Sequence, residues 1–464
     1  MTNNSKNIAI IGAGPGGYVA AIRAAQLGAD VTLIEKSLLG GTCTNLGCIP
    51  TKAMLNSVET ILKMRKAEQL GIKILKDKID FSLFMKKKDS VVEKSRKGIE
   101  FLLKKNGVNL IYGKGELLSK NLIKVTIANG EERIQADNII LATGSSPFKL
   151  RIFDFEQPTI LTSDNLMVLD EPPDSMVIVG GGVVACELAM VFHLLGTDIT
   201  VIEMLPNLLP LQDKRQSRYI ERSFKKEGIK FLTNSKVEGV KEYGEDFAIL
   251  SVEGKDDVKA KKVVVCIGRT PNSRDLGLEN LNIEMDRGFV KVNNKMETNI
   301  PGIYAVGDLI GGKMLAHVAS AQGEIVAENI MGHEAIFDDR MIPITIYTHP
   351  QVSSIGLTPD QAKENGYEIS LGNFPFSASG KANAIDESEG FIQIVADKNS
   401  GEILGAQMVG PDVSELIHLV AFAMQSELLI KDLSEMIASH PTLSEAVVEA
   451  ALSCIGRPLH TIKL

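Results

Sequence analysis

Two segments of the chain repeat one pattern: an apolar strand, a glycine-rich turn, a helical stretch, a second strand and an acid. The first spans residues 8–35 and the second residues 177–203. In both, the first glycine of the turn and the acid are 23 positions apart. Such a unit holds the phosphates of a dinucleotide at the start of its helix. We therefore expect an α/β fold with two Rossmann-like nucleotide-binding domains.

The first turn, Gly12-Ala-Gly14-Pro-Gly-Gly17, has the spacing of a phosphate cradle. Its first glycine makes the tight turn, its second lets the backbone approach a pyrophosphate, and its third lets the helix pack closely on the strand. Glu35 ends the following strand, where a carboxylate accepts hydrogen bonds from a ribose diol. These four residues predict a dinucleotide site; a merely tight strand-to-helix turn is the alternative.

The second turn carries Gly180 and Gly182, with a small alanine in the third place. Glu203 is the acid of this unit. A carboxylate there suits a free ribose 2′-hydroxyl and repels a 2′-phosphate, which favours NAD over NADP. Arg215 and Arg218 lie about a dozen residues further along the chain, too far to be expected to reverse this preference.

Cys43 and Cys48 lie five positions apart in a segment with three glycines, residues 40–52. In a regular helix such a pair is about 8 to 9 Å apart, which exceeds the reach of a disulfide. A bridge therefore needs a broken helix. The apolar pattern resumes after Pro50, so we expect Cys48 at a helix start, where the macrodipole favours its thiolate. We interpret the pair as a reducible, catalytic disulfide; a zinc half-site and two inert thiols are the alternatives.

His440 precedes a proline at the start of the last amphipathic stretch, and Glu445 follows five positions later. Histidine moves protons near neutral pH, and a nearby carboxylate orients the ring and stabilises its charged form. Pro441 disfavours helical geometry at His440, so the ring is expected to project from the helix end. Together with the cysteine pair, this pattern indicates an acid–base dyad; alone, a histidine before a helix is usually an ordinary surface residue.

Composition excludes several classes of protein. The chain has 464 residues and a formal net charge of -8, which argues against a nucleic-acid partner. No apolar run reaches the roughly 18 residues of a membrane span, so no membrane is expected. The strand at Ile8 follows the N-terminus without a signal peptide, and five cysteines are too few for a structural disulfide framework. We expect a cytoplasmic protein and no metal site.

The motif Gly-Gly-Thr-Cys-x4-Cys-Ile-Pro-x-Lys after the first fingerprint resembles the pyridine-nucleotide disulfide oxidoreductases, and the likeness covers nearly the whole chain. The resemblance implies that the first unit binds FAD, one per subunit, and the second NAD. Lys52 is similar to the lysine near the flavin, which pairs with Glu187 at the nicotinamide end. Further FAD contacts are implied for Gly115, Thr143, Gly144, Ser145, Asp308, Met314, Leu315, Ala316 and His317, and NAD contacts for Val237 and Gly268.

Four parts are predicted along the chain. Residues 1–147 form the FAD-binding domain, 148–272 the NAD-binding domain and 273–343 a central part that returns to the FAD domain. Residues 344–464, where strands alternate with amphipathic helices, form an α+β C-terminal dimerisation domain. The resemblance implies a C2 homodimer in which the dyad serves the disulfide of the other subunit.

The NAD-type acid and the run Cys-Ile-Pro-Thr-Lys favour, within this family, a member that oxidises a protein-bound dihydrolipoyl dithiol. The lipoyl group is then carried by a partner, which belongs to a 2-oxo acid dehydrogenase complex, acetoin dehydrogenase or the glycine cleavage system. The alternative is an NADPH-dependent reductase of low-molecular-weight disulfides, similar to glutathione reductase. A non-catalytic flavoprotein subunit is a third possibility, but it predicts damaged catalytic positions.

Overall fold

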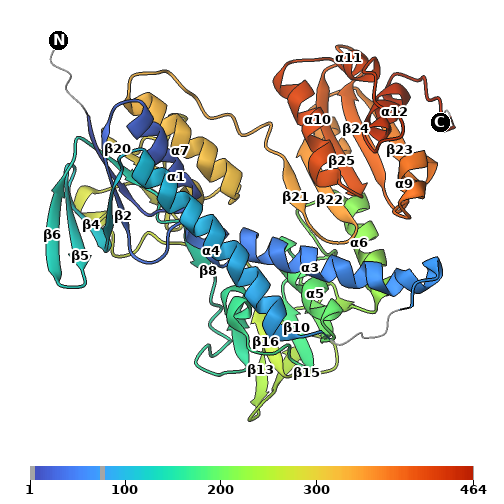
Figure 1. The fold of residues 1–464 in the computed structure, drawn as a ribbon, viewed down its shortest axis with the longest axis horizontal. Helices are drawn as coiled ribbons and strands as arrows, with labels where there is room; N and C mark the ends of the chain where they lie inside the picture. Colours follow the sequence, from blue (N-terminus) through green and yellow to red (C-terminus); the bar gives the residue numbers. More distant parts are fainter. Residues whose placement is uncertain (1–5, 74–78, 463–464) are drawn as a thin grey trace.

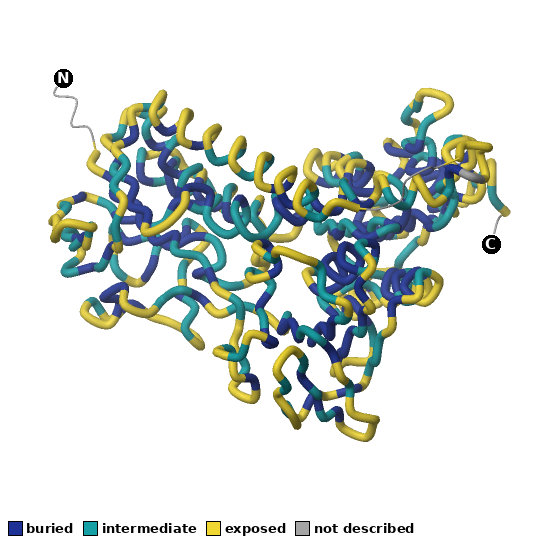
Figure 2. Tube along the Cα trace, turned by 60° about the horizontal axis from the view of Figure 1, so that its bottom comes forward, coloured by how far each residue is buried: buried dark blue, intermediate teal, exposed yellow. Residues whose placement is uncertain are grey.

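The computed structural model describes residues 6–73 and 79–462. Figure 1 shows three lobes, with the long helices α3 (Cys48–Ala67) and α4 (Phe81–Lys105) running between them. Figure 2 shows buried segments inside each lobe and exposed ones along the outer turns. Within the described residues, no helix is long and apolar enough to cross a membrane.

The first lobe is built on a parallel five-stranded sheet in the order β20-β7-β1-β2-β3. Strand β20 comes from far along the chain and pairs with β7, so the segment around residue 304 returns to the first lobe. The strands of this sheet are β1 (Asn7–Ile11), β2 (Asp30–Glu35), β3 (Asn109–Tyr112), β7 (Asn138–Leu141) and β20 (Ile303–Ala305).

Helices α1 (Pro15–Gln26) and α7 (Ala316–Ile330) lie side by side on this sheet (Figure 1). Pro15 occupies the first turn of α1, where its fixed φ suits a helix and its missing N–H costs nothing. Three fully buried alanines of α1 let the helices approach closely. An antiparallel meander completes the lobe: β4 (Lys114–Ser119), β5 (Leu122–Ile127) and β6 (Gly130–Gln135).

The second lobe repeats the first. Its parallel sheet has the order β12-β11-β10-β16-β9, with α5 (Val183–Leu194) after the glycine turn. As β1 does in the first lobe, β10 pairs with the next strand on one side and with the strand that closes the unit on the other. The strands are β9 (Ile160–Thr162), β10 (Ser175–Val179), β11 (Asp198–Ile202), β12 (Lys230–Leu232) and β16 (Lys262–Val265). Helix α6 (Lys214–Glu227) and a small sheet, β13 (Val237–Tyr243), β14 (Ala248–Val252) and β15 (Val258–Ala260), complete it.

The third lobe is an antiparallel sheet covered by helices, in the strand order β21-β22-β25-β24-β23. One buried cluster includes side chains from both the second and third lobes, so these lobes share a core. The strands are β21 (Ile344–Ile346), β22 (Gln351–Gly356), β23 (Ile369–Pro375), β24 (Phe391–Asp397) and β25 (Ile403–Gly410). The helices are α8 (Pro359–Glu364), α9 (Gly380–Ala384), α10 (Val413–Gln425), α11 (Ile430–Ser434) and α12 (Glu445–Cys454).

Two short strands, β8 (Ser145–Pro147) and β17 (Arg269–Pro271), pair where the chain passes between the first two lobes. A second ribbon, β18 (Met285–Asp286) and β19 (Phe289–Val290), follows. The fold class expected from the sequence, two Rossmann-like units and an α+β C-terminal part, is confirmed by these sheets. The boundaries after residues 147, 272 and 343 stay proposals.

Candidate active site

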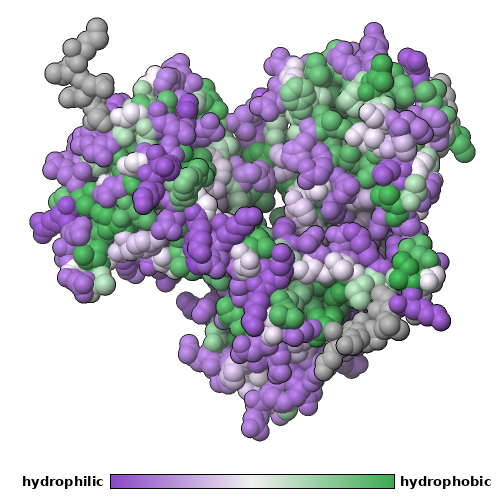
Figure 3. Space-filling view, viewed as in Figure 1, coloured by the Kyte–Doolittle hydropathy of each residue, from purple (hydrophilic) through white to green (hydrophobic). Residues whose placement is uncertain are grey.

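A large cavity lies where the lobes meet, and Figure 3 shows the surface hollowed between them. Its volume is about 2240 Å³, well above the roughly 300–1,000 Å³ of a site for one small molecule. Most of the predicted site residues line it: Gly12, Gly14, Glu35, Cys43, Cys48, Lys52, Gly115, Thr143, Gly144, Ser145, Gly182, Glu187, Asp308, Met314, Leu315, Ala316 and His317. Others do not: Gly17, Gly180, Glu203, Val237, Gly268, His440 and Glu445.

The first and third glycines of the turns are required by close backbone contacts, whereas the second glycines face open space. A Cβ on Gly12 or Gly180, both with φ above +100°, would lie within 2.5 Å of a backbone carbonyl oxygen. A Cβ on Gly17 would lie 1.8 Å from the oxygen of Gly12, so that position needs hydrogen for helix packing. By contrast, a Cβ on Gly14 would have its nearest neighbour at 3.9 Å, and one on Gly182 none within 4 Å. The second glycines therefore keep open space where phosphates are expected.

Glu35 and Glu203 have matching surroundings. Both side chains are buried, and each accepts two backbone N–H groups, one from the residue after the first glycine and one from two residues beyond the acid. The donor–acceptor distances are 2.7 and 2.8 Å at Glu35 and 2.6 and 2.8 Å at Glu203. Each carboxylate oxygen keeps acceptor capacity, because it uses one bond only. The two acids thus fit a ribose diol in both units.

Neither arginine beyond Glu203 is committed to the second nucleotide site. The guanidinium of Arg215 donates to Asn373 Oδ1 at 2.6 Å and stacks 3.6 Å above the ring centroid of Phe391. Arg218 is exposed on α6. Because the Arg215 guanidinium binds residues of the third lobe, its charge is not available for the 2′-phosphate of NADP. This supports the prediction of NAD.

Asn45, between the two cysteines, supplies a buried acceptor that has no protein partner. Its Nδ2 donates to the carbonyl oxygens of Leu39 and Gly41 at 2.9 and 2.8 Å, which fixes the orientation of the amide. Its Oδ1 is buried without a hydrogen bond, and the residue lines the cavity. A buried acceptor costs free energy unless a donor reaches it, and a bound dinucleotide carries hydroxyl and amine donors. The residues present therefore fit a cofactor here.

Cys43 and Cys48 are free thiols in the structure. Helix α2 (Gly41–Asn45) ends before Leu46, and α3 begins at Cys48, so the helix is broken between the two thiols as expected. A hydrogen bond from the Cys43 thiol, helped by the charge of Lys52, lowers the pKa of Cys48 to about 7 against burial and Glu187. The same hydrogen bond and burial raise the pKa of Cys43. The proton therefore stays on Cys43 and the thiolate forms on Cys48, chiefly because of the neighbouring thiol.

Lys52 pairs with Glu187, as the family resemblance implied. The Nζ atom lies 2.9 and 2.8 Å from the two oxygens of the buried Glu187 carboxylate. Tyr347 adds two contacts that sequence reasoning missed: its N–H donates to Glu187 at 2.9 Å, and its ring lies 4.7 Å from the Lys52 ammonium. The signal in the sequence was the run Tyr347-Thr-His-Pro directly after the strand at residue 344. This half-buried pair positions a positive charge one helical turn from Cys48.

Arg269 is a second residue that sequence reasoning missed. Its Nε and Nη2 atoms donate to the hydroxyl and carbonyl oxygens of Ser145 at 2.6 and 2.8 Å. The Ser145 hydroxyl in turn donates to Asp308 at 2.5 Å, and Arg269 lies 3.6 Å from that carboxylate. The signal was a charged residue directly after Gly268, in a segment that follows β16 as the segment around Gly144 follows β7. Arg269 thus links the crossover between the lobes to Asp308.

The residues from Met314 to His317 lie at the start of α7, with Leu315 as its N-cap. Their position places the positive end of the helix dipole at the cavity wall. His317 Nε2 lies 3.0 Å from the carbonyl oxygen of Pro343. Burial lowers the pKa of His317, although that contact opposes the shift. The segment can therefore present backbone donors and a neutral imidazole to a cofactor.

His440 and Glu445 form the predicted dyad at the start of α12. His440 Nδ1 lies 2.8 Å from Glu445 Oε1, and the Thr442 N–H donates to Glu445 Oε2 at 2.8 Å. Burial raises the pKa of Glu445, but these hydrogen bonds outweigh it and the net pKa is below its ordinary value. The His440 side chain is 78% exposed, and neither residue lines the cavity of its own chain. The dyad is formed, but within one subunit it stands apart from the cysteines.

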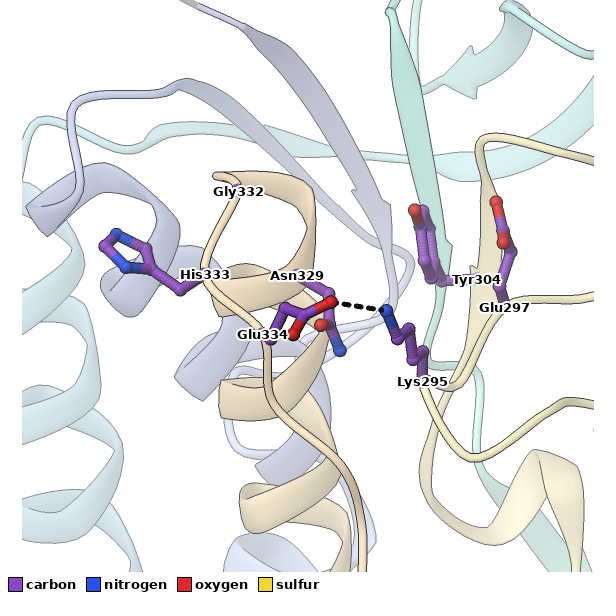
Figure 4. Close-up of a pocket in the computed structure, with 7 residues that line it drawn as sticks. All are labelled: Lys295, Glu297, Tyr304, Asn329, Gly332, His333 and Glu334. Atoms are coloured by element: carbon purple, nitrogen blue, oxygen red, sulfur yellow. Dashed lines mark ion pairs between the residues drawn. The ribbon is translucent and has the colours of Figure 1, made fainter.

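A smaller cavity of about 320 Å³ lies at the far end of α7. Figure 4 shows the Lys295–Glu334 ion pair reaching across it, with His333 directed away. None of the predicted site residues lines it. The smaller cavity is therefore not part of the candidate active site.

Comparisons with known proteins agree with this site. The family model "Pyridine nucleotide-disulphide oxidoreductase" matches residues 6–323, and the dimerisation domain of the same family matches residues 342–451. The chain belongs to the pyridine nucleotide-disulphide oxidoreductase family. The prediction of an oxidoreductase that uses FAD and NAD is thereby confirmed, and the dimerisation domain supports a homodimer.

Curated relatives with similar sequences are dihydrolipoyl dehydrogenases. The dihydrolipoyl dehydrogenase of Chlamydia muridarum is 41% identical over 461 residues, covering 99% of this chain and 98% of that protein. One from Bacillus subtilis is 40% identical over 468 residues, covering 98% and 99%. Among solved structures, LpdA from Mycobacterium tuberculosis has a TM-score of 0.90 at 29% identity, covering 96% of this chain and 99% of that one. The flavoprotein disulfide reductase RclA from Escherichia coli has a TM-score of 0.87 at 26% identity, covering 97% and 99%.

Proposed function

We propose that this enzyme oxidises a protein-bound dihydrolipoyl group to the disulfide and reduces NAD to NADH. The observation that carries the proposal is the thiol pair of Cys43 and Cys48, which shares one cavity with the FAD fingerprint and has a pKa of about 7 at Cys48. The relatives named dihydrolipoyl dehydrogenase, at about 40% identity over nearly the full chain, support the choice of substrate.

The reaction starts from the oxidised pair. One substrate thiol loses its proton to His440, whose Nδ1 is held by Glu445, and its thiolate attacks Cys43 Sγ. The bond between the two cysteine sulfurs breaks, and Cys48 leaves as the thiolate, the state that its lowered pKa favours. The second substrate sulfur then attacks the substrate sulfur bound to Cys43, and the mixed disulfide breaks. His440 passes its proton to Cys43 Sγ and takes up the proton of this second substrate thiol. This leaves a lipoyl disulfide and the dithiol pair present in the structure.

The chain's own groups prepare the cofactor sites. FAD, when bound, supplies the two-electron acceptor that returns the cysteines to the disulfide, with NAD as the final acceptor. Gly12, Gly14, Glu35 and Asp308 would hold FAD, and Gly182 and Glu203 would hold NAD. The Lys52–Glu187 pair keeps a positive charge beside the Cys48 thiolate.

The dyad requires a second subunit in this scheme. His440 and Glu445 do not line the cavity of their own chain, and the chain carries the family's dimerisation domain. In a C2 dimer each subunit presents the same surface to the other, so each dyad would serve the other subunit's cysteines. The lipoyl carrier would belong to a 2-oxo acid dehydrogenase complex, acetoin dehydrogenase or the glycine cleavage system. The sparse cysteines support the cytoplasm as the proposed location.

The test compares dihydrolipoamide plus NAD with glutathione disulfide plus NADPH, with bound flavin quantified. Turnover with the first pair only is expected. Cys43→Ser and Cys48→Ser should both lose dithiol oxidation and keep FAD, whereas Cys454→Ser, whose buried sulfur donates to Ser370 in the third lobe, should keep both. Turnover with glutathione disulfide only, or retained lipoamide turnover in both active-site variants, would overturn the proposal.

A further inference from the structure

Helix α4 has a charge opposite to that of the rest of the chain. It carries eight basic and three acidic residues, a formal net charge of +5. The whole chain has a net charge of -8, so the remainder carries -13. Figure 3 shows that hydrophilic side chains prevail along the course of α4. Helix α4 is therefore a long surface helix with a net positive charge on a chain whose net charge is negative.

Most of these positive charges are not neutralised locally. Lys88 turns inward to pair with Asp89, and Lys97 pairs with Glu93. The other five lysines of the helix are exposed and form no ion pair with any residue in the described part of the chain: Lys86, Lys87, Lys94, Lys104 and Lys105. Some exposed lysines of other elements, such as Lys230 and Lys241, do pair with aspartates. The unpaired positive charges of α4 are therefore exposed to solvent.

The helix also borders the active-site cavity. Asp89, Val92 and Arg96 of α4 line the same cavity as Cys43 and Cys48, while the unpaired lysines are exposed. The helix thus contributes to the wall of the site and also presents lysines to solvent. A macromolecule that delivers a reactive group into the cavity would pass beside these lysines.

We propose that the unpaired lysines of α4 form a docking surface for an acidic protein domain that carries the dihydrolipoyl group. The proposal rests on the proposed function and adds to it the charge of the partner and the place where it binds. Complementary charge raises the rate of encounter and selects partners more than it raises affinity. The surface would therefore act on kcat/KM for a carrier-borne substrate and not on the chemistry of a free one.

The experiment uses the full enzyme and three substrates. Free dihydrolipoamide is uncharged and reports the chemistry alone. Two synthetic peptides carry a dihydrolipoyl lysine, one flanked by glutamates and the other by lysines. The α4 variant replaces four lysines by glutamine: Lys86, Lys87, Lys94 and Lys104. The matched control replaces four exposed lysines of other surfaces, also without ion pairs to described residues: Lys120, Lys236, Lys255 and Lys363.

The wild type should prefer the glutamate-flanked peptide, and the α4 variant should lose about tenfold in kcat/KM for it at low ionic strength. The loss should shrink as salt is added, because screening shortens the reach of exposed charges. The control variant should keep the preference, and both variants should oxidise free dihydrolipoamide as the wild type does.

Equal use of the two peptides by the wild type, or an equal loss in both variants, would overturn the proposed surface. A change in oligomeric mass of the α4 variant alone would assign the helix to the subunit interface and overturn it as well. Failure of the wild type to oxidise free dihydrolipoamide would instead refute the proposed function, so the two failures are distinguishable.

Discussion

At the scale of single residues, the acidity of Cys48 depends on three neighbours whose effects differ in sign. The Cys43 thiol and Lys52 lower its pKa, while burial and Glu187 raise it. Lys52 is itself held by Glu187, so the two charges act on the thiol as a pair. Removing the lysine alone would leave a buried carboxylate beside the sulfur, which adds to the loss of the positive charge.

The reduced enzyme should therefore react with iodoacetamide at a rate that rises with pH through about 7, the pKa of Cys48. Lys52→Met should move this inflection upward by about one unit or more, the usual effect of losing a neighbouring opposite charge. Alkylation rates between pH 5 and 10 measure the shift. Lys63→Met removes an exposed lysine of the same helix and should leave the inflection in place; an unchanged inflection in Lys52→Met would contradict this account.

At the scale of elements, the two glycine turns have the same backbone geometry, and we propose that they bind different cofactors. Gly14 and Gly182 have ordinary negative φ values, -70° and -75°, so a side chain there meets no backbone strain. It would instead fill the open space at the start of α1 or α5. Substitutions at these positions therefore separate the two nucleotide sites.

Gly182→Val should raise the KM for NAD at least tenfold and leave the FAD content at the wild-type level, since it blocks only the second phosphate cradle. Gly14→Val should lose FAD itself. Flavin absorbance of the purified variants and steady-state kinetics in NAD check both. Loss of FAD from the Gly182 variant would show that the two units are not independent.

Helix α12 supports a second prediction at this scale. His440→Gln and Glu445→Gln should lower kcat by about 10²–10⁴, the usual contribution of a positioned base. The pKa of Glu445 lies below its ordinary value of 4.5. Its carboxylate therefore stabilises the start of α12 above pH 4.5, and this stabilisation is lost as the pH falls through the lowered pKa. His333→Gln, at an exposed histidine outside the large cavity, is the control. A kcat of His440→Gln equal to that of the control would remove the dyad from the mechanism.

At the scale of the whole molecule, one subunit holds the parts of the site in two places. The cysteines and cofactor cradles line the cavity, while the dyad stands on the third lobe outside it. The second and third lobes share a core, and close-packed interiors do not rearrange freely. A movement that brought the dyad to the cysteines of its own chain would therefore cost free energy. We therefore propose that a C2 dimer brings the two parts together without such a change.

Mixing inactive Cys43→Ser subunits with inactive His440→Gln subunits should restore activity. If pairing is random, half of the dimers are hybrids with one intact site each, so about a quarter of the wild-type rate is expected in a C2 dimer. Activity after unfolding and refolding the mixture, compared with each variant refolded alone, measures this. No recovery, with hybrids present by mass, would place the dyad and the cysteines of one site in the same subunit.

Short contiguous patterns carried most of what could be predicted. The glycine turns, the acids 23 positions later and the helix start at Cys48 are set by local backbone geometry, so their sequences reveal them. His440 and Glu445 are likewise close in sequence, and their hydrogen bond was foreseeable. The pairing of Lys52 with Glu187 came only from the family resemblance.

The tertiary structure alone decided the contacts between distant segments. Tyr347 contacts Glu187, Arg269 contacts Ser145, and Arg215 stacks on Phe391, in each case across more than a hundred positions. Such contacts depend on how lobes pack, and no local periodicity encodes them. The sequence by itself determined the two nucleotide-binding units, the thiol pair and the dyad, because the residues of each lie within one short stretch of the chain. Their assembly into one cavity, with the dyad left outside, followed from the packing of the three lobes.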